Sequence, residues 1–207
     1  ATAALGTAAL KAGISYNSLE QDSRVALTTL LGSAEAASAQ MERLGEFAAT
    51  SPLPKPIWVE AQQTLLSFGA AAEDIVPTLS AIQDQAAATG RTSAADIGGL
   101  VDIFARIQSS GQITGQELRQ FAIRGVDAAG LLAQAYGTTA DQIRQDITSG
   151  AIDGREALVL LTEQMTASFG GAAEGLRETW TGAVDMISGS FRRIGAILAA
   201  PFVDPMG

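Results

Sequence analysis

The chain has 207 residues, of which 47% are hydrophobic, 5% aromatic and 17% charged. This is enough apolar content for one large domain or two small ones. A formal net charge of -9 gives no general attraction to nucleic acid or to anionic lipid. There is no cysteine and no histidine, which excludes disulfides, thiolate chemistry, histidine-based triads and most zinc and transition-metal sites. Carboxylates, serines and arginines remain available, but the sequence has no Gly-rich phosphate loop and no nucleophile elbow, so we expect no catalytic residue, no metal, no cofactor and no enzyme activity.

No uncharged apolar run reaches the roughly 20 residues that a membrane span needs. The nearest approach, Ile194 to Val203, is far too short. No secretory signal pattern opens the chain, and its first residue is Ala1 and not methionine. We expect the chain to be a piece of a longer protein.

Apolar residues recur at helical spacing almost throughout, and no alternating strand pattern is evident. A first helix is predicted to end at Leu31, before Gly32. Ser33 can cap the next helix, which has Met41, Leu44 and Phe47 on one face.

The segment Ser51–Pro56, SPLPKP, holds three of the six prolines and is predicted to be an extended linker. Helices are predicted over Ile57–Phe68 and Ala72–Ala88, where Pro77 either kinks the second helix or stands in its first turn. This divides the chain into an N-terminal helical hairpin region (1–50), the linker (51–56) and a main helical body (57–207). One continuous domain over 13–200 is the alternative.

Residues that start or end helices are closely spaced from Ser93 onward. Ser93 is predicted to cap a helix that ends before Gly111, and Gly170-Gly171 to end a longer helix. The helices expected after Gly111 cover Glu117–Ile123, Ala128–Tyr136, Ala140–Thr148 and Arg155–Phe169.

A single helix of this length would span about 310 Å. Interrupted by 22 glycines and 6 prolines, the chain should fold back on itself instead. The predicted fold class is all-α: a compact array of short and medium helices joined by Gly, Pro and Ser turns, and not a single long rod.

One apolar stripe, at spacings of three and four residues, runs along the last predicted helix, Leu176 to Ala200. Such a stripe either faces the core or forms a surface for a partner helix or for self-association. Its candidate partner-contact residues are Trp180, Val184, Ile187, Phe191, Ile194 and Leu198.

The pattern Ser-Gly-x-Ile-x-Gly-x-Glu occurs at Ser110–Glu117 and again at Ser149–Glu156, 39 residues later. It matches part of a calcium-binding EF-hand loop but lacks the acidic ligands at the first and third positions. Thr114 and Glu117 have the spacing of a capping box, as do Asp153 and Glu156. Each copy is therefore interpreted as the end of one helix, a turn with an isoleucine (Ile113 or Ile152) packed beneath it, and the start of the next helix.

A helix-turn-helix is the second pattern of interest, in Leu131 to Ile147. Its would-be recognition helix carries Asp141, Arg144 and Asp146 and so has no net positive charge. Since phosphate contacts need lysine or arginine, an ordinary helical hairpin is the favoured interpretation and no specific nucleic-acid binding is expected.

The order of several segments is similar to the tape measure domain of phage and prophage tail tape measure proteins, from about Gly13 to Leu198. The resemblance rests on GISYNSLEQ, LTTLLGSAEAASAQMERLGEFAATSP, TLLSFGAAAEDIVPTLSAIQDQAAATG, FARIQSSGQITGQELRQFAIRGVDAAGLLAQAYG, SGAIDGREALVLLTEQM and SFGGAAEGLRETWTG. Two departures are Leu53, where the family favours an aromatic residue, and Gln83, where it favours glycine.

The resemblance implies a structural protein that lies in the lumen of the growing tail tube and sets tail length. It implies contacts with tail tube proteins, tail-tip proteins and assembly chaperones, and self-association. It also implies that the protein leaves the tube ahead of the DNA at infection and contacts the host membrane. The implied location is the virion, after assembly in the host cytoplasm. Because this segment is broken into short helices, we expect a folded anchoring module and not the ruler itself. The alternatives are a DNA-binding regulator using Leu131–Ile147 and a membrane-active segment using Phe191–Val203.

Overall fold

The computed structural model describes residues 20–177, and within this range the chain is all-α, as the sequence predicts. A helix over residues 20–31 comes first, and a last helical turn begins at residue 172. Between them lie α2 (Ala34–Thr50), α3 (Lys55–Ser67), α4 (Ala72–Thr89), α5 (Ala94–Ser110), α6 (Gly115–Ile123), α7 (Ala128–Tyr136), α8 (Ala140–Ser149) and α9 (Gly154–Phe169).

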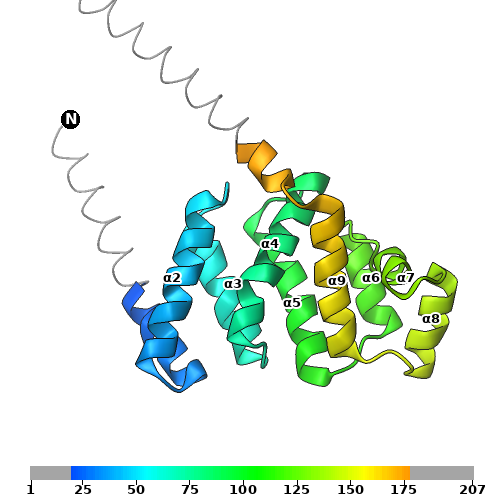
Figure 1. Ribbon diagram of the computed structural model, residues 1–207, viewed down its shortest axis with the longest axis horizontal. Coiled ribbons are helices and arrows are strands. Elements are labelled where there is room, and N and C mark those ends of the chain that lie inside the picture. Colours follow the sequence, from blue (N-terminus) through cyan, green and yellow to red (C-terminus); the bar gives the residue numbers. More distant parts are fainter. Residues whose placement is uncertain (1–19, 178–207) are drawn as a thin grey trace, which may run out of the picture.

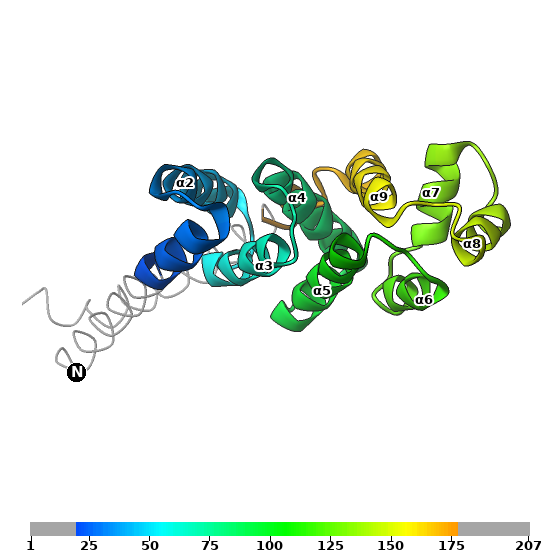
Figure 2. The same cartoon turned by 90° about the horizontal axis from the view of Figure 1, so that it is seen from below.

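The helices form an elongated array in which the chain advances from α2 at one end to α8 at the other (Figure 1). Seen from below, they stand in two layers, with α2, α4, α9 and α7 above α3, α5 and α6 (Figure 2). Helix α9 returns from the α8 end of the array and lies between α4 and α7, which it contacts along with α5. The predicted compact array is thus confirmed for the described residues.

One hydrophobic core runs through the array from Leu27 to Met165. Trp58 and Phe104, among the largest of its fully buried side chains, each pack edge-on against another ring. Trp58 meets Phe47 with ring centroids 5.1 Å apart, and Phe104 meets Phe121 at 5.7 Å. The division of the chain at residues 51–56 stays a prediction.

Most helix ends lie within two residues of their predicted positions, because the chain marks them chemically. Gly32, Gly111 and Gly150 each end a helix with a positive φ, which glycine adopts without steric cost. The next helix then starts with a capping side chain, as where Ser33 accepts from the backbone N–H of Ala36 at 3.0 Å.

Two proline predictions need correction. Helix α3 begins at Lys55, so the extended segment ends at Pro54, and Pro56 stands in the first turn, where its missing N–H costs nothing. Pro77 lies inside α4, beyond its first turn, and the helix continues through it to Thr89, so the first-turn alternative is wrong, whereas a kink at Pro77 stays a prediction.

Helix α4 carries a buried carboxylate, Asp84, that accepts hydrogen bonds from the backbone just after α9. Asp84 accepts from the backbone N–H of Ala173 at 3.0 Å and from that of Gly171 at 3.3 Å. These N–H groups belong to the start of the last helical turn, so Asp84 acts as a cap supplied by a distant helix. The neighbouring Gln83, one of the departures noted above, is also buried, and its Oε1 lacks a hydrogen-bond partner.

Candidate functional site

The predicted partner-contact residues lie outside the described residues. This applies to Trp180, Val184, Ile187, Phe191, Ile194 and Leu198, and also to Phe191–Val203 of the membrane-active alternative. They stay predictions.

The two copies of the repeated pattern lie against each other. The backbone N–H of Gly154 donates to the carbonyl of Gly111 at 2.9 Å, and Gln112 and Asp153 form an isolated antiparallel bridge. A Cβ on Gly154 would lie 2.6 Å from the backbone nitrogen of Gln112 and 2.7 Å from the carbonyl carbon of Gly111. The repeat is evident in the sequence, whereas this contact, which joins the start of α9 to the end of α5, is not.

The first copy forms the predicted capping box. Thr114 Oγ1 accepts from the backbone N–H of Gln116, and the Glu117 carboxylate accepts from the backbone N–H of Thr114 at 3.1 Å. The carboxylate that an EF-hand would use for calcium is therefore bonded to its own helix start.

The second copy forms only half of a capping box. Asp153 accepts from the backbone N–H groups of Arg155 and Glu156 at 2.9 and 3.0 Å. Glu156 accepts from the Tyr136 hydroxyl of α7 at 3.2 Å. Burial raises the pKa of Tyr136, and the hydrogen bond to Glu156 and the charges of Glu156 and Asp153 raise it further. Within residues 20–177, no three acidic side chains gather as a metal site would need.

A groove of about 220 Å³ lies between α4 and α9 and is also lined by residues of α3 and α5. Leu65, Phe104 and Leu158 are buried in its floor, whereas Val159 of α9 remains 54% exposed. The apolar lining consists of Leu65, Ala70, Pro77, Phe104, Leu158 and Val159.

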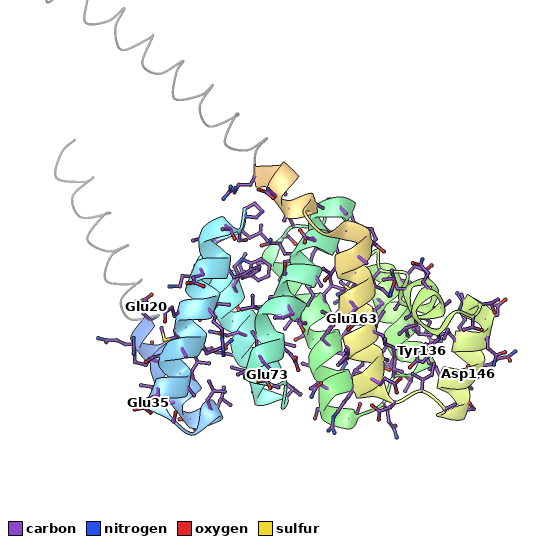
Figure 3. The ribbon with its side chains drawn as sticks, in the orientation of Figure 1. Glu20, Glu35, Glu73, Tyr136, Asp146 and Glu163 are labelled. Carbon is purple, nitrogen blue, oxygen red and sulfur yellow. The ribbon has the colours of Figure 1, made fainter. Side chains whose placement is uncertain are left out.

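Acidic side chains stand on both sides of this groove. Asp74 comes from the first turn of α4 and Glu163 from the middle of α9, and both are exposed. Figure 3 shows Glu163 midway along α9 and Glu73, the neighbour of Asp74, at the start of α4. Arg155 lies in the first turn of α9, and its Nε donates to the carbonyl of Gln108 at 3.1 Å. The sequence did not reveal this groove.

The helix-turn-helix pattern corresponds to α7 and α8. Gly137 ends α7 with a φ of 65°, and Thr139 caps α8. On α8, Arg144 forms an ion pair with Asp141 at 2.7 Å on an exposed face. Ile143 and Ile147 are buried, so the other face of α8 packs against the core. The basic group available for a phosphate contact on α8 is thus already paired with a carboxylate.

The chain matches the family described as tape measure protein over residues 8–198. The chain belongs to the tape measure protein family. No curated protein and no solved structure matches the chain. The tape measure family is a class of structural proteins and not of enzymes. For this tape measure segment, no helix among residues 20–177 combines the length and the apolar character that crossing a bilayer requires.

Proposed function

We propose that this tape measure segment is a folded anchoring and interaction module within the phage tail. In this proposal the whole protein sets tail length inside the tube during assembly, and leaves the tube when DNA is ejected. The module does not measure length itself. Its place is the tail lumen of the virion, after assembly in the host cytoplasm.

The observation that carries the proposal is the fold. As one helix, the 158 residues from 20 to 177 would extend about 237 Å at about 1.5 Å per residue. Folded, the longest helix from α2 to α9 is α4, with 18 residues, which is about 27 Å. A segment that turns back on itself adds little length per residue, and its elongated array offers side surfaces for other proteins.

The partners that we propose are tail tube and tail-tip proteins, tail assembly chaperones and further copies of the same protein. The net charge of -9 is of the same sign as that of DNA, which supports the proposal that the protein does not retain the DNA passing through the tube. Host-membrane contact during ejection is part of the same proposal. Liposome flotation with the 207-residue chain, with and without Phe191–Val203, tests it.

In-frame deletions in the full-length tape measure gene test the anchoring role. Removal of residues 34–177 should abolish or impair tail assembly, and any tails that form should not be shorter by the helical length of the deletion. Electron microscopy of the tails measures both. Normal numbers of tails, each shortened by about 1.5 Å per deleted residue, would show that the segment is part of the ruler.

The DNA-binding alternative has a separate test. A gel shift with the 207-residue chain should show no binding, since Arg144 is paired and α8 carries two acidic residues, Asp141 and Asp146. Tight, salt-sensitive binding that Arg144→Ala removes would favour the regulator instead.

A further inference from the structure

We propose that the groove between α4 and α9 binds an amphipathic segment of a partner protein, one that presents an apolar side chain flanked by lysine or arginine. The inference rests on the proposed interaction role of the segment. It adds the location of the contact and the chemistry of the partner.

The size and lining of the groove indicate an apolar anchor. Its volume of about 220 Å³ can hold one or two large side chains. The floor is formed by buried Phe104 and Leu158, whereas Val159 and Pro77 at its edge are exposed. Water in such a groove gains few hydrogen bonds, so an apolar side chain that displaces it gains the free energy of burial.

The charges on the rim determine which flanking residues fit. Asp74 and Glu163 stand exposed on two different helices that border the groove. The lining also has one cation, Arg155, whose Nε donates to the carbonyl of Gln108, so the two carboxylates leave the lining with an excess of one negative charge. Lysine or arginine beside the apolar anchor would meet both carboxylates, whereas an acidic segment would be repelled.

The same charges disfavour one other occupant. An anionic membrane brings phosphates, which the two carboxylates would repel. A basic amphipathic segment is therefore the occupant that both the shape and the charge of the groove support.

A designed peptide probes the groove directly. The probe is a helical peptide of leucine and lysine only, with a leucine–glutamate peptide of the same pattern as its control. Binding to the 207-residue chain is followed by fluorescence anisotropy. We expect saturable binding of the leucine–lysine peptide, weakened at least tenfold by Val159→Asp. Ile123→Asp is the matched control, because Ile123 is 68% exposed on α6, outside the groove lining.

Charge-reversal variants distinguish binding in the groove from general electrostatic attraction between the peptide and the acidic chain. Asp74→Lys and Glu163→Lys should each weaken binding of the leucine–lysine peptide several-fold, and together they should favour the leucine–glutamate peptide. Glu73→Lys is the matched control for Asp74→Lys, since it makes the same charge change in the same turn of α4 but does not line the groove. Equal effects of Glu73→Lys and Asp74→Lys, or of Val159→Asp and Ile123→Asp, would overturn the proposal, as would an absence of saturable binding.

Photo-crosslinking identifies the natural occupant. A benzophenone side chain at position 159 of the full-length protein, activated during tail assembly, should crosslink to a partner segment in which apolar residues are flanked by lysine or arginine. A crosslink to residues 178–207, or to a second copy of this chain, would contradict the proposal. Tail length in the deletion experiment is unaffected by either outcome, so the two proposals can fail separately.

Discussion

The backbone N–H of Gly154 and the carbonyl of Gly111 are 2.9 Å apart, and no side chain fits on Gly154 at this approach. The contact joins two turns that share one sequence pattern and belong to different parts of the array. Gly154 is the sixth residue of its copy, and Gly115 holds the same place in the other copy. A Cβ on Gly115 would meet nothing within 4 Å.

The two equivalent glycines should therefore respond differently to substitution. Gly154→Ala places a methyl group against the backbone of Gln112 and should reduce the free energy of unfolding by about 1–3 kcal/mol. Gly115→Ala should be neutral or stabilise by up to about 1 kcal/mol, because alanine favours the helix. Urea unfolding of the 207-residue chain measures both, and equal effects would mean that the turns do not touch in solution.

The two capping arrangements should differ in a double-mutant cycle. Thr114→Ala and Glu117→Ala each remove part of one reciprocal box, so their effects on the free energy of unfolding should couple by about 0.5–1 kcal/mol. Asp153→Ala should cost about 1 kcal/mol, but its coupling to Glu156→Ala should be near zero. Strong coupling between Asp153 and Glu156 would contradict the bonding that we describe.

Asp84 should control the stability of the chain from Gly171 onward. Asp84→Ala leaves the backbone N–H groups of Gly171 and Ala173 without their acceptor and should cost about 1–3 kcal/mol. Asp84→Asn keeps one carbonyl acceptor and should cost less. Hydrogen exchange at Ala173 should accelerate more than exchange in α5 if the effect is local, and unchanged exchange at Ala173 would exclude the capping role.

Tyr136 should make stability pH-dependent in the alkaline range. Its pKa is raised above the ordinary value of 10.0, so the folded state favours the neutral phenol. The resulting stabilisation is complete below pH 10 and is lost as the pH rises through the folded-state value. Tyr136→Phe should remove this alkaline decline, measured against the parent chain by urea unfolding.

The phenol can also be titrated directly. In a Tyr16→Phe background, ultraviolet absorbance reports Tyr136 alone, because the chain has only two tyrosines. Glu156→Gln removes one negative charge next to the hydroxyl, so it should lower the pKa of Tyr136. A pKa that does not change in this variant would rule out the contribution of Glu156.

The positions of the helices could be predicted from the sequence because the signals are local. A left-handed glycine such as Gly111 or Gly150 and a capping residue such as Ser93 or Thr139 act within one turn of themselves. Pro77 was the harder case. Its effect depends on whether packing can hold a helix together after one backbone hydrogen bond is lost, and the local sequence does not contain that information.

The contacts between helices could not be predicted in the same way. Gly111 and Gly154 are 43 residues apart, and nothing in either turn specifies that the other lies beside it. The groove could not be predicted for the same reason. Val159 has the apolar character of a core residue, and its 54% exposure results from how α4 and α9 are placed over α5.

The contact of Asp84 with Gly171 and Ala173 can form only after residue 173 has been synthesised. It spans 87 and 89 residues of chain, which a ribosome adds in roughly 4 to 18 s. Until α9 has been made near the end of that interval, the apolar face of α4 that α9 later covers is open to water. For the described residues, the period in which the nascent chain needs protection from aggregation therefore lasts until α9 is in place.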